Sequence, residues 1–129
     1  MDVPAGLFYT KTHEWVRRES ADAVVGITAH AQEELRDIVF LELPKVGKAV
    51  KQGEPAAVIE SVKAAFDIYA PVSGTVTRVN GAAAASPQLI NQDCYGVGWL
   101  FAIAPGSAEE FASLMPADTY AKQIEAGTH

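Results

Sequence analysis

The sequence predicts a mainly β protein, an antiparallel β-sandwich with one short internal helix and two C-terminal helices. Short runs rich in Val, Ile, Thr and aromatic residues recur with turn signals about every eight to twelve residues, which is typical of a sandwich or barrel. After Gly106 helix-start signals and helical spacing of apolar residues replace this pattern. We therefore expect one domain over residues 1–129, with a core at about 7–104 and helices at about 107–125.

The first half of the chain is expected to hold short strands around one helix. Thr28 is the expected N-cap of a helix at 29–35, because its hydroxyl can accept a hydrogen bond from a helical amide. The strand that follows this helix should end at Pro44, since proline cannot donate to a sheet ladder. The strands expected here are residues 7–10, 14–18, 23–27 and 37–43, with a brief extended segment at 49–51.

The centre of the pattern is the stretch AAVIESVKAAFDIYAPVSG, residues 56–74. Two extended runs, 56–59 and 66–70, lie on either side of Lys63, and the breaker 71–74 stops the second run. This spacing predicts a β-hairpin with Lys63 at or near its tip.

The remaining elements alternate between turn, strand and helix signals. Asn80-Gly81 is expected to turn the chain after a strand, and 82–85 is a short alanine tract. Ser107 and Glu110 fit a capping box in front of a helix. The other expected elements are strands at 75–79 and 99–103, a loop at 91–98, a first C-terminal helix carrying Phe111, Leu114 and Met115, and a second helix at 117–125 that docks through Tyr120 and Ile124.

Composition limits the kinds of molecule that the chain is expected to bind and the compartment in which we expect it. The chain has 16 acidic and 10 basic residues, so its net charge of −6 disfavours nucleic acid and anionic membranes as partners. No run of about 18 apolar residues is present, so no membrane span is expected. Cys94 is the only cysteine, which excludes an internal disulfide and favours a reducing compartment. The first residues resemble neither a signal peptide nor an Arg-rich leader, so we expect a bacterial cytoplasmic protein, or a mitochondrial matrix protein whose transit peptide has been removed.

A lysine at a hairpin tip is usually a solvated cation. A free lysine has a pKa near 10.4, so at neutral pH it is almost entirely protonated and neither nucleophilic nor redox active. Acylation removes that charge. Lys63 therefore acquires chemistry only when a group is attached to it. Its flanks also suggest more than solvation, because Glu60 stands three positions before it and Asp67 four after.

The segment Glu60-Ser61-Val62-Lys63-Ala64 resembles the lipoyl-lysine hairpin of the glycine cleavage system H-protein family. Biotin carrier domains differ, since they usually place methionine on both sides of the lysine. Lipoyl domains of 2-oxoacid dehydrogenases usually place aspartate where this chain has Val62. The resemblance covers nearly the whole chain. Further matches, in order, are Tyr9-Thr10-Lys11, His13-Glu14-Trp15-Val16, Val25-Gly26-Ile27-Thr28, Ala31-Gln32, Val39-Phe40, Glu42-Leu43-Pro44, Pro71-Val72-Ser73-Gly74, Tyr95 and Gly98-Trp99-Leu100.

The resemblance implies a lipoyl-domain-like fold, a barrel-sandwich hybrid, and a non-catalytic carrier. Lipoate would be attached to Lys63 as an amide by a lipoate-attaching enzyme. A pyridoxal-phosphate-dependent glycine decarboxylase would load the arm with an aminomethyl group, and a tetrahydrofolate-dependent aminomethyltransferase would unload it. Dihydrolipoamide dehydrogenase would reoxidise the arm. The hard chemistry then belongs to the cofactor and the partner enzymes. We expect a monomer that binds neither nucleic acid nor membrane.

The resemblance also implies where the loaded arm rests. Thr12, Glu14 and Asp67 match positions that shelter the arm, and carboxylates there can pair with an aminomethyl ammonium. Glu60 has two interpretations: recognition by the lipoate-attaching enzyme, or simple solvation. Four features depart from the family pattern: Arg36 in place of a frequent glycine whose backbone tends to be left-handed, Phe66 in place of a smaller residue, Cys94 in place of a frequent proline, and alanines at 82–85 in place of acidic residues.

Other functions have less support. His13-Glu14 begins like a zinc-protease motif, but Arg17 occupies the place of its second histidine. The segment 96–98 lacks the rest of a phosphate-binding fingerprint. Two alternatives stay open: a relay protein that supplies lipoyl or octanoyl groups to 2-oxoacid dehydrogenase complexes, and an unmodified binding module whose hairpin is only a docking edge.

Overall fold

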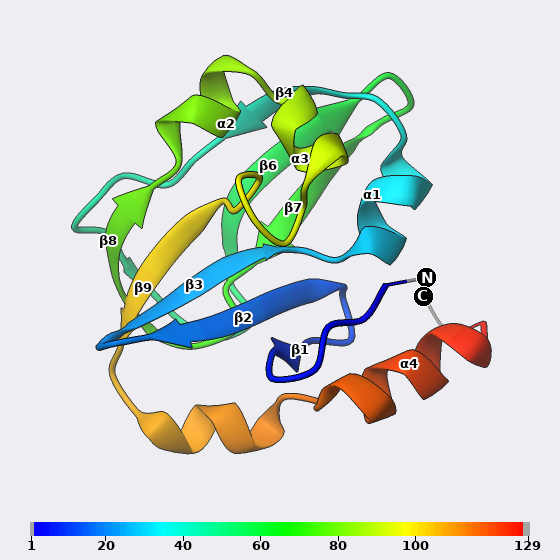
Figure 1. The fold of residues 1–129 in the computed structure, drawn as a ribbon. Coiled ribbons are helices and arrows are strands. Elements are labelled where there is room, and N and C mark those ends of the chain that lie inside the picture. Colours follow the sequence, from blue (N-terminus) through cyan, green and yellow to red (C-terminus); the bar gives the residue numbers. More distant parts are fainter. Residues whose placement is uncertain (1, 128–129) are drawn as a thin grey trace.

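The structure, a computed structural model that describes residues 2–127, consists of two antiparallel sheets with a few helices and no closed barrel (Figure 1). The larger sheet has six strands in the order β1-β2-β3-β9-β8-β5. Its strands are β1 (Phe8–Tyr9), β2 (Glu14–Glu19), β3 (Asp22–Ile27), β5 (Ala49–Val50), β8 (Gly74–Val79) and β9 (Phe101–Pro105). The mainly β fold predicted from the sequence is thus confirmed.

The smaller sheet carries the central hairpin. It has three strands in the order β4-β6-β7, with bounds β4 (Ile38–Glu42), β6 (Pro55–Ser61) and β7 (Ala65–Tyr69). In the hairpin, Ile59 pairs with Phe66 and Glu60 with Ala65. The predicted hairpin is therefore present.

The core lies between the two sheets. Buried side chains of both sheets form one cluster there, including Val16 and Val25 of the large sheet and Leu41, Ile59 and Ile68 of the small one. A second cluster covers the other face of the large sheet, where Tyr9, Trp15, Val24, Ala102 and Tyr120 pack together. The sandwich is thus held by apolar burial on both faces of its larger sheet.

Three internal helices are present where one was predicted. Helix α1 (Ala29–Leu35) begins as expected, with the Thr28 hydroxyl accepting a hydrogen bond from the amide of Ala31. The predicted turn at Asn80-Gly81 is instead the start of α2 (Gly81–Ala85), because the Asn80 side chain accepts from the amide of Ala83 and caps a run of good helix formers. Helix α3 (Gln88–Gln92) extends into the predicted loop at 91–98.

The C-terminal segment also differs from the expected pair of α-helices. The first is a 3₁₀ helix, η1 (Ala108–Ser113), and Leu114 and Met115 lie beyond it. Ser107 accepts from the amide of Glu109, but the carboxylate of Glu110 does not complete a capping box. It binds the amide and hydroxyl of Ser73 instead, at 2.6 and 2.8 Å, because the turn before β8 offers two donors to it.

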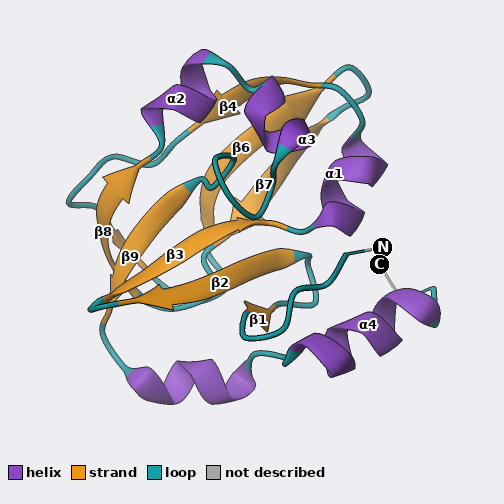
Figure 2. Cartoon of the chain, viewed as in Figure 1, coloured by secondary structure: helices purple, strands orange, loops and turns teal. Residues whose placement is uncertain are grey.

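The second C-terminal helix, α4 (Ala117–Glu125), docks as predicted. Its Tyr120 is fully buried, and Ile124 packs against the same cluster. Figure 2 shows η1 and α4 following one another along the side of the fold that carries β1 and β2. No helix within residues 2–127 has both the length and the apolar character needed to cross a membrane.

The predicted strand at 99–103 is shifted along the chain, because β9 starts only at Phe101. Trp99 and Leu100 precede it, although the amide of Leu100 still donates to the carbonyl of Val25 at 2.8 Å. Element boundaries of this kind depend on long-range pairing, which the local sequence does not encode.

Candidate functional site

Lys63 lies in the turn of the β6–β7 hairpin, between the end of β6 at Ser61 and the start of β7 at Ala65. Ser61 shapes this turn. Its amide donates to the carbonyl of Ala64 at 2.9 Å, and its hydroxyl oxygen accepts from the amides of Lys63 and Ala64 at 3.1 and 3.3 Å. A single serine thus satisfies the backbone of the turn and leaves the lysine side chain exposed.

The turn contacts the segment between α1 and β4, which runs beside it at one end of the fold (Figure 1). The Lys63 ammonium donates to the carbonyl of Glu34 at 3.2 Å, and the amide of Val62 donates to the carbonyl of Asp37 at 3.1 Å. Glu34 belongs to the last turn of α1, where unpaired carbonyls and the helix dipole favour a cation.

A half-open cavity of about 420 Å³ lies directly beside Lys63. Its apolar wall comes from Ile27, Leu35, Phe66 and Ile68. Thr12, His30, Glu34 and Asp67 supply polar groups around this wall. We refer to this space as the lysine cavity. It can take an apolar chain that starts at the lysine.

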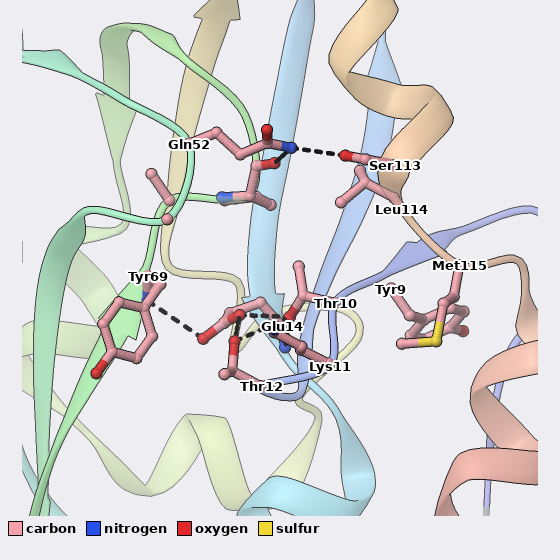
Figure 3. Close-up of a pocket in the computed structure, with 13 residues that line it drawn as sticks. Tyr9, Thr10, Lys11, Thr12, Glu14, Gln52, Tyr69, Ser113, Leu114 and Met115 are labelled. Carbon is pink, nitrogen blue, oxygen red and sulfur yellow. Dashed lines mark hydrogen bonds between the residues drawn. The ribbon is translucent and has the colours of Figure 1, made fainter.

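A second cavity, of about 530 Å³, has Glu14 in its wall (Figure 3). Thr12 lines both cavities, so the two are neighbours. The far wall of the second cavity is built by Gln52 and by residues 113–115, which begin at the last residue of η1, and the Gln52 side-chain amide donates to the Ser113 hydroxyl at 2.9 Å. We call this space the Glu14 cavity.

Glu14 is the most deeply buried acidic residue of the described chain, with 1% of its surface exposed. One carboxylate oxygen accepts from the hydroxyls of Thr10 and Thr12, and the other accepts from the amide of Tyr69 at 3.2 Å (Figure 3). Burial raises the pKa of Glu14 above its ordinary value, and the hydrogen bonds from Thr10, Thr12 and Tyr69 oppose that rise. The arrangement holds a carboxyl group in a place where ionisation is costly.

The four residues predicted to dock the arm or to be recognised lie in different places. Asp67 is exposed at the rim of the lysine cavity, Glu14 lies in the wall of the second cavity, and Thr12 joins the two. Glu60 lines neither cavity. It is exposed on the outer face of the small sheet, where it pairs with Phe40 of β4. Asp67 therefore shares the lysine cavity with Lys63, Glu14 lines the second cavity, Thr12 lines both, and Glu60 lines neither.

Sequence reasoning missed three contributors to the site. Thr10 binds Glu14 in the same way as Thr12, and its position two residues earlier in the same segment was the only available signal. The amide of Tyr69 comes from a strand 55 residues away. The wall at 113–115 comes from a segment that was expected to be helical.

The departures noted in the sequence have different structural consequences. Arg36 adopts φ 65° and ψ −140°, so the expected positive φ is present and arginine is strained there. Phe66, 45% exposed, forms part of the lysine cavity. Cys94 is buried, and burial raises the pKa of its thiol to about 12, so the thiolate is scarce at neutral pH. Residues 82–85 belong to α2.

The chain matches known proteins over almost its full length. A family model described as glycine cleavage H-protein matches residues 7–127. The chain belongs to the glycine cleavage H-protein family. It is 52% identical over 130 residues to a glycine cleavage system H protein of Nitrosomonas europaea, covering 100% of both chains. It is also 49% identical over 125 residues to a Thermus thermophilus protein of the same name, covering 97% of this chain and 98% of that one.

A solved structure of the family has the same fold. The crystal structure of a glycine cleavage system H protein from Mycobacterium marinum superposes with a TM-score of 0.89 at 39% identity, covering 95% of this chain and 99% of that chain. Membership of the H-protein family supports a role as a lipoyl carrier in the glycine cleavage system, and it implies a lipoyl cofactor. H proteins are carrier subunits, which suggests a non-catalytic role.

Proposed function

We propose that this chain carries lipoate as an amide on Lys63 and moves an aminomethyl group between separate enzymes of the glycine cleavage system. One observation carries the proposal: the exposed lysine lines a largely apolar cavity, and Thr12 in the wall of that cavity also lines a second cavity with a buried carboxyl group. Two neighbouring cavities of this kind suit an arm that is apolar along its length and carries a cation at its loaded end.

The lysine cavity fits the attached group. An arm of lysine plus lipoyl chain reaches on the order of 10 to 15 Å from the backbone, long enough to leave the turn and follow a surface. Ile27, Leu35, Phe66 and Ile68 offer that arm an apolar wall. After acylation the lysine nitrogen keeps one N–H, so it can still donate to the Glu34 carbonyl, which the ammonium contacts at 3.2 Å. When bound, the group supplies a dithiolane that opens to a dithiol.

The Glu14 cavity fits the cargo. An aminomethyl group on sulfur carries an ammonium, and a buried carboxylate with three hydrogen-bond donors around it can pair with that cation in low dielectric. Pairing would also offset the cost of ionising Glu14 in this place. The wall of Gln52 and residues 113–115 covers one side of this cavity, and a docked arm would cover more of it, which would slow hydrolysis of a labile group.

The partners of the carrier follow from the same chemistry. A pyridoxal-phosphate-dependent glycine decarboxylase would load the arm, a tetrahydrofolate-dependent aminomethyltransferase would unload it, and dihydrolipoamide dehydrogenase would reoxidise it. A lipoate-attaching enzyme must recognise the turn at Lys63, and the exposed Glu60 beside it is available for that contact. Bacterial relatives favour the bacterial cytoplasm as the site of action and give no support to a mitochondrial location.

Intact mass tests the proposal directly. The apo protein, incubated with a lipoate-attaching enzyme, lipoate and ATP, should gain one lipoyl increment on the peptide that contains Lys63. Loaded with that group, it should support glycine–bicarbonate exchange by the decarboxylase. A mass that stays at the sum of the residues would contradict the carrier function and leave only an unmodified binding module.

A further inference from the structure

We propose that Asn91 is a positioning residue for the Lys63 turn, acting through the segment 36–38 between α1 and β4. The inference rests on the proposed function, because it concerns how the turn is presented to the enzyme that acylates the lysine. Asn91 stands in α3, at the start of the segment 91–98 that was predicted to be a loop, and it lines neither of the two cavities.

Asn91 holds the segment 36–38 from both sides. Its side-chain amide nitrogen donates to the carbonyl of Arg36 at 2.7 Å and to the side-chain oxygen of Gln32 at 3.1 Å. Its side-chain oxygen accepts from the amide of Ile38 at 3.0 Å. All hydrogen-bonding groups of one side chain are therefore committed to α1 and the segment that leaves it.

The segment 36–38 in turn holds the lysine turn. The carbonyl of Asp37, which lies between the two residues bound by Asn91, accepts from the amide of Val62 at 3.1 Å. The next residue, Ile38, pairs with Ser61, whose hydroxyl accepts from the amide of Lys63. Hydrogen bonds joined by the backbone of the segment 36–38 thus link α3 to Ser61 and Val62, the two residues that precede Lys63.

Local preference does not hold this segment in place. Arg36 has φ 65°, a backbone conformation that is unfavourable for a residue with a Cβ and persists only where surrounding contacts fix it. The three hydrogen bonds of Asn91 are such contacts. Without them, the Arg36 backbone is free to relax, the Asp37 carbonyl turns away from Val62, and the turn samples positions that a partner does not recognise.

The chain offers a matched control in Asn80. Its side chain also makes three hydrogen bonds to other segments, donating to the carbonyls of Val97 and Trp99 at 2.8 and 2.6 Å and accepting from the amide of Ala83 at 3.3 Å. These bonds lead to α2 and to the loop before β9, not to the lysine turn. Asn80 is also more deeply buried than Asn91, so its loss should destabilise the fold at least as much.

The experiment compares Asn91→Ala and Asn80→Ala as acceptors of lipoate from a lipoate-attaching enzyme, well below the unfolding temperature of either variant. We expect Asn91→Ala to raise the KM for the apo protein about fivefold with kcat changed less than twofold. The reason is that the Lys63 turn occupies the recognised position in only a fraction of the variant molecules. Asn80→Ala should keep the wild-type KM. Asn91→Asp, which retains the acceptor for Ile38 but not the donor for Arg36, should give an intermediate KM.

A second readout does not depend on any enzyme. Amide hydrogen exchange of Val62 in the apo protein should be faster in Asn91→Ala than in wild type, and unchanged in Asn80→Ala. Equal effects of the two alanine variants on KM, or unchanged exchange at Val62 in Asn91→Ala, would overturn the inference. Failure of the wild-type protein to accept lipoate would instead refute the proposed function, while the exchange at Val62 would still report whether Asn91 positions the turn.

Discussion

The lysine turn and the Glu14 cavity differ in the exposure of their central side chains to solvent. Lys63 is exposed, and its turn is held by backbone hydrogen bonds and one serine hydroxyl. Glu14 is fully enclosed, and its two oxygens are occupied by two hydroxyls and an amide. Under the proposed function this difference is expected, because a lysine that other enzymes must reach has to protrude, whereas a carboxylate that pairs with a cation is most effective when it is buried. Thr12, which lines both cavities, is where the two requirements meet.

Replacing Lys63 should abolish the attachment of lipoate while leaving the Glu14 cavity intact. Lys63→Arg keeps the positive charge and the exposed position but offers no acylatable amine, so lipoylation and glycine–bicarbonate exchange should fall to background. The free energy of unfolding should change by less than about 0.5 kcal/mol, because the residue lies at the surface. Mass spectrometry, exchange assays and thermal unfolding measure these outcomes. Lys48→Arg, at another exposed turn lysine, should retain full lipoylation and activity.

Neutralising the buried carboxyl group should shorten the life of the cargo without affecting attachment. Glu14→Gln keeps the shape and an acceptor for the Tyr69 amide but removes the charge that pairs with an ammonium. We expect release of the aminomethyl group from the loaded protein to be about tenfold faster, which corresponds to about 1.4 kcal/mol. Lipoylation should proceed at the wild-type rate.

The exposed carboxylate provides the contrast for that experiment. Asp67→Asn should accelerate release much less than Glu14→Gln, because Asp67 is exposed and its charge is screened by solvent. Equal acceleration by the two variants, or a lifetime unchanged in Glu14→Gln, would show that burial of Glu14 does not hold the cargo.

Relieving the strained backbone of Arg36, next to the lysine turn, should have a smaller effect than the substitutions of Lys63 and Glu14. Arg36→Gly removes the Cβ at a positive φ and should raise the free energy of unfolding by about 1 kcal/mol. Urea unfolding measures this change, and Arg18→Gly in β2 is a control in which glycine should instead destabilise the protein. A destabilised Arg36→Gly variant would mean that the arginine side chain contributes more than its backbone costs.

The smallest expected effect is a pH dependence of stability. A raised pKa means that folded Glu14 binds its proton more tightly than unfolded Glu14, so stability is greatest when the group is protonated and falls as pH rises through the folded pKa. Glu14→Gln lacks this loss. The melting temperature of the variant relative to wild type should therefore increase from acidic to neutral pH. A constant difference across that range would contradict the raised pKa.

Strongly local signals made much of the fold and one part of the site predictable. The hairpin around Lys63 was predictable because two extended runs and a breaker follow one another within residues 56–74. The N-cap at Thr28 was predictable because its hydroxyl binds an amide only three residues away. The positive φ at Arg36 followed from the place of a glycine in related chains.

What sequence reasoning missed depends on contacts between distant segments. Asn80-Gly81 was predicted to be a turn but begins α2, because this dipeptide suits both a turn and a helix start, and Ala83 of the helix packs in the core. Glu110 was assigned to a local capping box but binds Ser73, 37 residues away. The environment of Glu14 could be named only in part, since the Tyr69 amide reaches it across sheets.

The wall at residues 113–115 has a consequence for how the protein is made. Met115 exchanges two backbone hydrogen bonds with Tyr9, so an early and a late segment of this sequence together line the Glu14 cavity. During translation Lys63 emerges from the ribosome well before Met115. A nascent chain therefore displays the Lys63 amine while the Glu14 cavity is unfinished, and the cavity is complete only after residues 113–115 have been synthesised and have folded against Tyr9.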